Sequence, residues 1–561
     1  MEITPANIHS SNLFRSRSSS RTRNSTANSR STSSTRRPSI GKRSLSGTSL
    51  NKLTITPTTV DHEKSIPTTQ AVLDNSLPLD FFKQDLITLI KALKVSKWHK
   101  RQLTMSNLVI NRISGALTNS IYKLEYYDPH QNLKLPALLL RIYGKNVDSI
   151  IDRESELAIL IKLSQKRIGP RLLGIFTNGR FEQFLEGFIT LNKDQIRDEV
   201  LSQMLARRMK DLHYRIELDL DDRISSLPMS WKLINKWLDI LQKDFLPNYE
   251  KNNLDTKEVF LVEFPRLKEL IKKYRTWLFQ KYDSESFSSN FKFCHNDTQY
   301  GNLLLNETFD ATEIIVDTTP NTPAGSSASL AQDNQADIKS TSNKKDSNMV
   351  VIDFEYSGPN FPAYDLANHF SEWMSDYHHP TESYKIHEQN FPSKKQRLNM
   401  IKSYVEYDFQ YPSSNLKTKL PPALSESNAS ELIEYEIKKL YNECTYWRST
   451  VQIFWSLWGL IQSGPVKIAS PNLSGKESSE PGIESTYTIT TALDTFTLEE
   501  DALIEEDITS TDDDFDYLKY AQQKVALILG DFIQFGLMDK SEIDEKYWPL
   551  LKIVDCSELD V

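Results

Sequence analysis

Two short apolar runs flanked by polar residues constrain the fold of this chain more than any other feature. Asp297 is followed five residues later by Asn302, which directly precedes the apolar run 303–305. A second acid, Asp353, directly follows the apolar run 350–352. Short apolar runs are typical of buried strands, and a buried carboxylate or amide is costly unless it is paired. The pattern therefore predicts two strands whose polar ends face a common cleft.

The spacing of these three residues indicates a type of chemistry. An Asp, an Asn five residues later and a second Asp on a later strand form the arrangement with which kinase-like folds transfer phosphoryl groups. One carboxylate takes the hydroxyl proton of the acceptor, the Asn binds Mg²⁺, and the other carboxylate bridges the metal to the phosphates. The alternative is a buried hairpin whose polar residues only cap its turns. The spacing alone occurs by chance in a long chain, so the flanking apolar runs carry the interpretation.

The sequence around these residues extends the pattern. Segments 295–302 (His-Asn-Asp-Thr-Gln-Tyr-Gly-Asn) and 352–356 (Ile-Asp-Phe-Glu-Tyr) are followed by 365–373 and 454–458. Together these segments resemble the choline/ethanolamine kinase family, from about residue 108 to 537, and are slightly closer to fungal ethanolamine kinases. The resemblance implies an α+β, bilobal protein-kinase-like fold, with a small antiparallel-sheet N-lobe and a larger, mostly helical C-lobe.

Composition divides the chain into a tail, two lobes and two insertions. Residues 1–76 are rich in Ser, Thr, Arg and Asn and poor in large apolar residues, so we expect a disordered tail. We expect the nucleotide-binding N-lobe in 77–185 and the catalytic and acceptor-binding C-lobe in 186–561. Polar sequence without apolar periodicity predicts disordered insertions at about 306–348 and 464–513.

Apolar periodicity predicts the elements of the N-lobe. Residues 79–93 repeat apolar side chains at helical spacing, and 150–166 read as a second helix. The segments 108–110, 121–124 and 137–143 read as strands of a small antiparallel sheet.

Charge and cysteine content exclude several function classes. The 561 residues carry 67 Lys and Arg against 75 Asp and Glu, a net charge of −8. The first 50 residues are basic and the remainder is acidic, which fits no nucleic-acid-binding core. Three scattered cysteines are too few for a disulfide framework or a zinc site, so we expect a reducing, cytoplasmic setting. No run reaches the roughly 18 continuous apolar residues of a membrane span.

A segment between two predicted strands, 113–120, is the candidate phosphate-binding loop. Gly115 permits close approach of the backbone, and Thr118 and Asn119 can donate hydrogen bonds to phosphate oxygens. The segment resembles the corresponding loop of choline kinases, although Ala116 stands where the family usually has a second glycine. An ordinary hairpin turn is the alternative.

The resemblance implies further nucleotide contacts. Arg141 matches the nucleotide-contacting arginine of the family, and Glu156 is expected to hold it, with Glu154 as the second choice. A generic surface Arg–Glu pair is the alternative. The segment that includes Gln183 and Phe184 resembles the part that receives the adenine. Those residues, with Gln299 as a further contact to nucleotide or phosphate, complete the predicted ATP site.

Aromatic residues in and after the catalytic segments form the candidate acceptor pocket. They are Tyr356, Trp373, Trp455, Trp458, Tyr517 and Tyr520. Aromatic faces attract cations, and cages of them recognise quaternary ammonium groups. Glu355 and Glu372 would add negative charge for an amine. Packing in the lobe core is the alternative, and the resemblance favours the cation pocket. His295 and His369 are expected to bond the backbone of the catalytic loop.

The resemblance implies an ATP- and Mg²⁺-dependent kinase that phosphorylates the hydroxyl of ethanolamine, of choline or of both, as a step of phospholipid synthesis. Asp297 would orient and deprotonate this hydroxyl, and Asn302 and Asp353 would bind the metal. We expect activity on both substrates, with ethanolamine narrowly favoured. A homodimer is implied by the resemblance alone.

Two other functions fit part of the sequence. A phosphotransferase for aminoglycosides or homoserine would share Asp297, Asn302 and Asp353 but would not need the aromatic residues. A non-catalytic pseudokinase scaffold would not need the three polar residues, all of which are intact.

Overall fold

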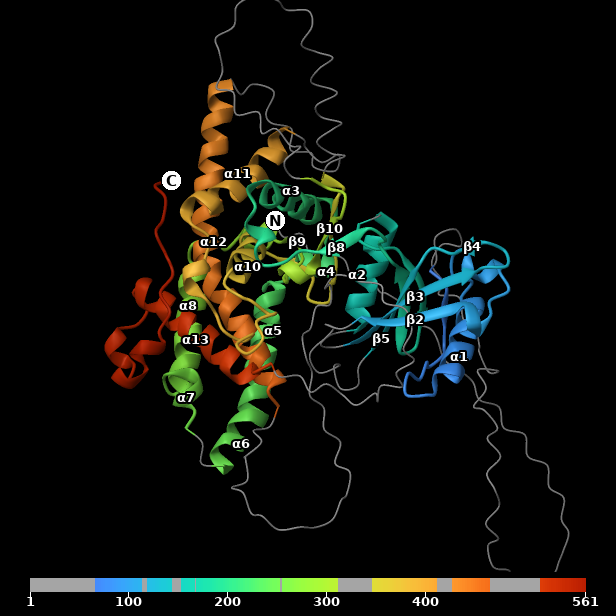
Figure 1. Ribbon diagram of the computed structural model, residues 1–561. Helices are drawn as coiled ribbons and strands as arrows, with labels where there is room; N and C mark the ends of the chain where they lie inside the picture. The colour runs from blue at the N-terminus through green and yellow to red at the C-terminus, as the bar shows by residue number, and fades with distance from the viewer. Residues whose placement is uncertain are drawn as a thin grey trace, which may run out of the picture. The chain divides into compact units, whose positions relative to one another are not determined.

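A computed structural model describes most of the chain, and its helices and strands form two lobes, each with its own hydrophobic core. The described residues are 66–113, 119–143, 153–166, 168–252, 255–310, 346–410, 426–464 and 515–561. The N-terminal core lies on a sheet, and the C-terminal core lies mainly among helices. Figure 1 labels these elements, with the strands β2, β3 and β5 and the helix α1 in blue. The predicted α+β class is confirmed.

The N-lobe sheet has the strand order β1-β6-β7-β5-β3-β2, with β4 paired to β3. Its strands are β1 (Thr68–Thr69), β2 (Leu108–Ile113), β3 (Asn119–Asp128), β4 (Leu133–Lys134), β5 (Leu138–Tyr143), β6 (Leu172–Phe176) and β7 (Gly179–Gln183). Neighbouring strands are antiparallel except β1 and β6, which are parallel. All three predicted strands lie in this sheet and pair antiparallel, as predicted. The parallel strand β1 comes from the segment that was expected to belong to the tail.

Residues 66–76 are ordered, which moves the expected boundary of the tail. β1 pairs with β6, and Ala71 and Leu73 are buried in the N-lobe core. The side chain of Asn178 donates to the carbonyl of Leu73 and accepts from its amide, both at 2.9 Å. Composition did not predict that this segment is ordered, because only two of its residues form a strand. The rest of the expected tail lies outside the described residues.

Two helices accompany the sheet, as predicted. Helix α1 (Leu79–Ala92) buries Phe82, Leu86, Leu89 and Ile90 on one face, the face that the apolar spacing indicates. Helix α2 (Arg153–Lys166) follows β5.

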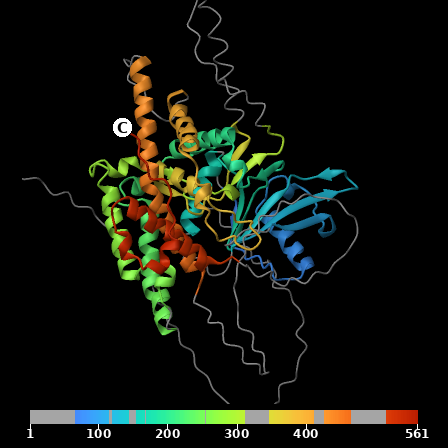
Figure 2. The same ribbon diagram turned by 60° about the vertical axis from the view of Figure 1, so that its left-hand side comes forward.

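The C-lobe is mostly helical and centres on the long helix α12. Its helices are α3 (Glu199–Arg215), α4 (Leu220–Arg223), α5 (Met229–Ile240), α6 (Leu246–Lys251), α7 (Lys257–Phe260), α8 (Phe264–Phe279), α10 (Pro362–Glu372), α11 (Lys394–Gln410), α12 (Glu426–Gln462) and α13 (Tyr517–Gln534). Helices α5, α10, α11 and α13 all pack against α12, and Figure 2 shows α12 and α13, in orange and red, side by side. None of the described helices is both long enough and apolar enough to cross a membrane.

Two small sheets in the C-lobe position the polar residues singled out above. One has the order β11-β10-β8, with β8 (Phe188–Thr190), β10 (Leu303–Asn306) and β11 (Met349–Val351). The other pairs β9 (Lys292–Cys294) with β12 (Gly358–Asn360). Leu303 lies opposite Val351, and the amide of Ile352 donates to the carbonyl of Asn302 at 3.0 Å. The predicted pair of adjacent strands is therefore confirmed.

The predicted insertions lie for the most part outside the described residues. The described ends of the first belong to the β10–β11 hairpin, where Arg207 of α3 forms two hydrogen bonds to Asp346 at 2.7 and 2.8 Å. Of the second, only Gly464 is described.

We predict that Gly530→Ala destabilises the C-lobe. A methyl group at this position of α13 would overlap the backbone carbonyl oxygen of Lys552, so the helix or the C-terminal segment must shift. Overpacking of this kind costs about 1–3 kcal/mol, which urea unfolding would measure. The control is Gln523→Ala on the same helix, where the side chain is half-buried and we expect a smaller effect. Equal stability of Gly530→Ala and wild type would contradict this packing.

Candidate active site

The loop that follows β9 carries Asp297 and is held by the buried carboxylate of Asp365. Asp365 lies in the first turn of α10. It accepts hydrogen bonds from the backbone amides of His295 at 2.8 Å and Asn296 at 2.9 Å, and from Nε2 of His213 at 2.9 Å. Burial raises the pKa of Asp365, but the hydrogen bond and charge of His213, together with the backbone hydrogen bond from His295, act in the opposite direction, and the pKa lies below its ordinary value. The carboxylate is therefore an ionised anchor for the loop.

Asn296, directly before Asp297, takes the left-handed backbone conformation, with φ of 66°. Asn is among the few residues that adopt this conformation at little cost. Its side-chain amide donates to the carbonyl of Tyr356 at 2.9 Å, and its amide oxygen accepts from Asn360 at 2.9 Å. These bonds fix the orientation of the next residue, Asp297.

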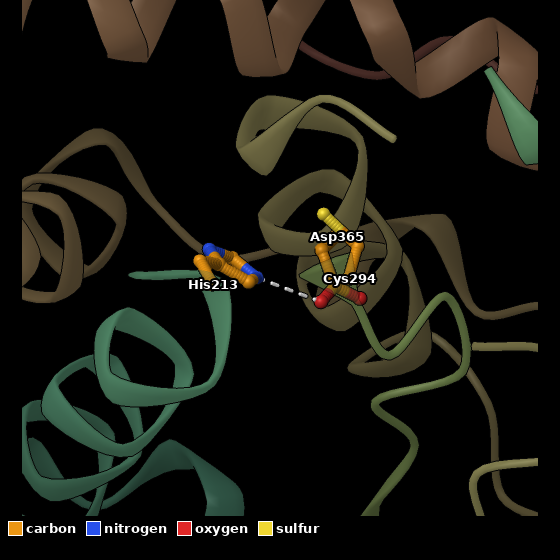
Figure 3. A group of neighbouring side chains, drawn as sticks. All are labelled: His213, Cys294 and Asp365. Carbon is orange, nitrogen blue, oxygen red and sulfur yellow. Dashed lines mark hydrogen bonds and ion pairs between the residues drawn. The ribbon is translucent and has the colours of Figure 1, made fainter. Parts of the chain in front are cut away.

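His213, Cys294 and Asp365 form a compact cluster below the loop, with one ligand-type atom of each within 4.8 Å of the others (Figure 3). These residue types can bind metals, but here each makes protein hydrogen bonds. Nδ1 of His213 bonds to the hydroxyl of Tyr404 at 2.7 Å, and the thiol of Cys294 donates to the carbonyl of Asn360 at 3.5 Å. Burial raises the pKa of the Cys294 thiol well above its usual range, so it is not poised to act as a thiolate. The cluster fixes the loop.

His295 and His369 bond the backbone around the loop, as predicted. Nε2 of His295 donates to the carbonyl of Ile352 at 2.8 Å, so its Nδ1 accepts from the amide of Asp297 at 3.3 Å. Nδ1 of His369 donates to the carbonyl of Thr298 at 2.9 Å. Burial lowers the pKa of both rings, to about 4 for His369. Both rings are therefore neutral structural groups near pH 7.

The three predicted polar residues meet at the end of the β10–β11 hairpin. The amide nitrogen of Asn302 donates to the backbone oxygen and to Oδ2 of Asp297, both at 2.9 Å. Its amide oxygen is then the atom that could bind a cation. Asp353 has a φ of 65° and accepts from Nη1 of Arg141 at 3.1 Å. Burial raises the pKa of Asp353, but the charges of Arg141 and Arg180 and the hydrogen bond from Arg141 act in the opposite direction, and the net shift is downward.

Four carboxylates interact at this site, and we call Asp297, Asp353, Glu355 and Glu372 the acidic cluster. Burial, followed by the charges of Glu372, Asp353 and Glu355, raises the pKa of Asp297 well above its usual range. Two anionic oxygens that repel each other favour any cation that binds between them. The site therefore favours the binding of a cation.

Five aromatic side chains form a continuous series beside the acidic cluster, and we call them the ring cluster. They are Tyr356, Trp455, Trp458, Tyr517 and Tyr520. Ring centroids are 5.4 Å apart for Tyr356 and Trp455, 5.5 Å for Trp455 and Trp458, and 5.7 Å for Trp458 and Tyr517. Tyr520 lies 6.3 Å from Trp458. The predicted placement of Trp455 and Trp458 on one helix is confirmed.

Hydrogen bonds fix the rings of this cluster. Nε1 of Trp458 donates to the hydroxyl of Tyr356 at 2.9 Å, and Nε1 of Trp455 donates to Oδ1 of Asn368 at 2.7 Å. After burial, the charges of Glu355 and Asp297 further raise the pKa of Tyr356. The ring cluster therefore borders the acidic cluster.

The structure places one residue that was not predicted, Tyr377, beside the acidic cluster, and it places the predicted Trp373 outside the ring cluster. The hydroxyl of Tyr377 donates to Oε2 of Glu372 at 2.7 Å. Tyr377 lies just beyond segment 365–373, which carries the family resemblance. Trp373 instead donates from Nε1 to Nε2 of His369 at 3.1 Å, and the guanidinium of Arg197 lies 6.0 Å from its ring. Trp373 therefore contacts His369, which supports the catalytic loop, and is not a member of the ring cluster.

Glu156, which we expected to hold Arg141, acts on it through its charge: burial lowers the pKa of Arg141, but the charges of Asp353, Glu182 and Glu156 give a net upward shift. Glu156 pairs with Nη1 of Arg180 at 2.9 Å, while the ion pair of Arg141 is with Asp353. Arg180 lies on β7 directly opposite Arg141 on β5, and it also pairs with Glu182. Sequence reasoning missed Arg180 because the pairing of β5 with β7 is not visible in the sequence. The available signal was the spacing of Arg180 and Glu182, which are two residues apart and therefore lie on the same face of a strand. The side chain of Glu154 is outside the described residues.

The other predicted nucleotide residues that the structure describes make contacts within the protein. Gln183 accepts from Nε of Arg171 at 3.1 Å, and the ring of Phe184 lies 5.0 Å from the ammonium of Lys123. Oε1 of Gln299 accepts from the amide of Gly301 at 3.2 Å and caps a short turn. The predicted loop residues Gly115 and Thr118, and the side chain of Asn119, lie outside the described residues. Their contacts to a nucleotide stay predictions.

Comparison with known proteins defines the class of this chain. Residues 110–529 match the choline/ethanolamine kinase family, and residues 57–107 match the choline kinase N terminus. The chain belongs to the choline/ethanolamine kinase family.

Two relatives from Saccharomyces cerevisiae narrow the comparison. The chain is 39% identical to a choline kinase, with 88% of this chain and 82% of the relative covered. It is 30% identical to an ethanolamine kinase, with 84% and 80% covered. A choline kinase structure from Cryptosporidium parvum has a TM-score of 0.51 at 20% identity and covers 83% of this chain and 99% of that one; it supports the kinase-like fold. The order of the two identities is opposite to the slight closeness to ethanolamine kinases expected from the sequence segments.

We predict that Asp365→Asn lowers stability at neutral pH, because His213 and two backbone amides lose a charged acceptor. Removing one partner from a buried pair of this kind costs about 3–5 kcal/mol. The pKa of Asp365 is depressed in the folded state, so its contribution is present above the unfolded pKa and is lost as pH falls through the folded pKa. Urea unfolding at pH 7 and at acidic pH would measure both effects.

The matched control is Asp239→Asn on the exposed face of α5. It should leave stability nearly unchanged at both pH values. If the Asp365→Asn protein has the same free energy of unfolding at pH 7 as this control, the carboxylate does not anchor the loop.

Proposed function

We propose that this protein transfers the γ-phosphoryl group of ATP to the hydroxyl of choline and, less efficiently, of ethanolamine. The observation that carries the proposal is the proximity of the acidic cluster to the ring cluster, where the charges of Glu355 and Asp297 act on the hydroxyl of Tyr356. Carboxylates and aromatic faces both attract an ammonium group, and Asp297 belongs to the carboxylates. A cationic alcohol that binds there would have its hydroxyl next to Asp297.

Asp297 would orient the hydroxyl and accept its proton. As the bond from the hydroxyl oxygen to the γ-phosphorus forms, the bond to the leaving oxygen of ADP breaks and the proton passes to the carboxylate. The raised pKa of Asp297 makes it a stronger base than an ordinary aspartate, while positioning supplies most of the rate enhancement in such reactions.

The oxygen donors at this site fit Mg²⁺. Asn302 offers its amide oxygen, because its nitrogen is bonded to Asp297, and Asp353 offers a carboxylate held ionised by Arg141. Mg²⁺ prefers such oxygen ligands together with substrate phosphates, and when bound it neutralises developing charge on the phosphates. Arg141 would clamp phosphate oxygens, as its fork geometry allows. Arg180 and Glu156 would hold α2 on the sheet.

The ring cluster supports choline as the better acceptor. A trimethylammonium group has no N–H to donate and is recognised by aromatic faces, whereas a primary ammonium has three donors that need acceptors. Glu355 and Glu372 add negative charge for either group. The higher identity to the yeast choline kinase supports the same order, although the sequence segments had narrowly favoured ethanolamine.

The direct test is ATP-dependent phosphorylation of choline, ethanolamine, homoserine and an aminoglycoside in parallel, with Mg²⁺ present. We expect conversion of the first two, with the higher kcat/KM for choline. Conversion of the aminoglycoside or homoserine alone would replace this proposal with the related phosphotransferase. Mg²⁺-dependent ATP binding without any conversion would mean that the acceptor is a different alcohol.

We predict that Trp455→Leu raises the KM for choline and leaves the KM for ATP unchanged. A cation–π contact contributes about 0.5–2 kcal/mol, which corresponds to a rise in KM of about twofold to thirtyfold. Steady-state kinetics would measure both constants. The control is Tyr435→Leu, an exposed aromatic residue on the same helix, which should change neither. An unchanged KM for choline in Trp455→Leu would exclude the ring cluster as the ammonium site.

We predict that choline binding weakens as pH falls through the raised pKa of Asp297. Protonation removes negative charge from the acidic cluster, and choline itself does not titrate. The loss should therefore begin at a pH above the ordinary aspartate value of 3.8. Quenching of tryptophan fluorescence by choline without nucleotide would measure the affinity. Constant affinity down to pH 3.8 would contradict the assignment.

A further inference from the structure

Lys524 is a buried cation beside the acidic cluster that the proposed reaction does not use. It lies on α13, one turn after Tyr520, and has no exposed surface. Its ammonium nitrogen has no hydrogen-bond partner among the described residues. A buried ammonium without hydrogen bonds is costly, so its position calls for a compensating interaction.

The compensating groups are those expected to bind the acceptor. Nζ of Lys524 is 3.9 Å from Oε1 of Glu372 and 5.1 Å from the ring centroid of Tyr520. The charge of Asp297 also acts on it and, with Glu372, opposes the lowering of its pKa by burial. Lys524 therefore presents to the site the two interactions, with a carboxylate and with an aromatic face, that an ammonium substrate would use.

Lys524 and Tyr377 together engage both oxygens of Glu372. The hydroxyl of Tyr377 donates to Oε2 at 2.7 Å, and the ammonium of Lys524 faces Oε1. A primary ammonium needs acceptors for its three N–H groups, so an engaged Glu372 serves it poorly. A trimethylammonium group donates no hydrogen bond and loses only electrostatic attraction.

We propose that Lys524 is a specificity-determining residue, which holds Glu372 and thereby biases the pocket toward a quaternary rather than a primary ammonium. The inference rests on the proposed function and concerns which amino alcohol is preferred. Lys524 acts through Glu372 and has no contact with the reacting atoms.

Replacement of Lys524 by Met tests the proposal, because Met has similar length and no charge. Loss of the positive charge should strengthen binding of both acceptors, and ethanolamine should also gain Oε1 of Glu372 as a hydrogen-bond acceptor. We expect the ratio of kcat/KM for ethanolamine to that for choline to rise about tenfold, a typical size for a hydrogen bond to a charged group. The change should lie in KM for the acceptor, with KM for ATP unchanged.

Controls separate this role from a structural one. Lys519→Met, on the same helix but exposed and paired with Asp516, should leave the ratio unchanged. In a Glu372→Gln background, Lys524→Met should no longer change the ratio, because the two residues act as one unit. If Lys524→Met does not fold, Lys524→Gln makes the same comparison with a polar side chain.

The outcomes are distinct. A folded, active Lys524→Met or Lys524→Gln protein with the wild-type ratio would overturn the proposal, even if its thermal stability changed. A ratio that rises equally in the Glu372→Gln background would also overturn it, because Lys524 would then act through another group. Failure of the proposed function would appear earlier, as a wild-type protein that phosphorylates neither amino alcohol.

Discussion

The buried carboxylate of Asp365 is the interaction on which the site depends. It receives two backbone amides of the catalytic loop and the ring of His213, and so connects α10, α3 and the strand β9. Each of these donors would be an unsatisfied buried group without it. The same helix that supplies Asp365 also carries His369 and Glu372, so one element fixes the position of Asp297 and supplies part of its electrostatic surroundings.

Charge balance is the second constraint on this region. The acidic cluster is opposed by Arg141 at Asp353 and by Lys524 at Glu372. Asp297 accepts a hydrogen bond from the neutral amide of Asn302. Buried carboxylates that repel one another favour bound cations, which here are the proposed metal and the ammonium of the acceptor. The same repulsion that destabilises the free site would then drive binding of its ligands.

Local patterns in the sequence predicted local structure well. The apolar runs around Asn302 and Asp353 predicted the β10–β11 hairpin, and helical spacing predicted both α1 and the shared face of Trp455 and Trp458. These features depend on neighbours a few residues apart, which periodicity reveals. The slightly closer resemblance to ethanolamine kinases rested on short segments, and comparison over most of the chain gives the opposite order.

Pairs between distant segments could not be predicted. Arg180 lies opposite Arg141 because β7 pairs with β5. Lys524 reaches Glu372 because α13 and α10 both pack on α12. Trp373 matched a family segment, yet its hydrogen bond to His369 turns it away from the ring cluster. A motif names residue types, whereas the direction of each side chain is set by tertiary packing.

The measurement that tests this account most directly is a comparison of wild type and Asp297→Asn in both activity and thermal stability. Because the pKa of Asp297 is raised in the folded state, its ionised form at pH 7 opposes folding. We predict that the neutral amide raises the melting temperature of the free protein while it lowers phosphorylation of choline by orders of magnitude. A variant that stays active, or that melts at a lower temperature than wild type, would contradict the claim that Asp297 is a catalytic carboxylate whose ionised form destabilises the free protein.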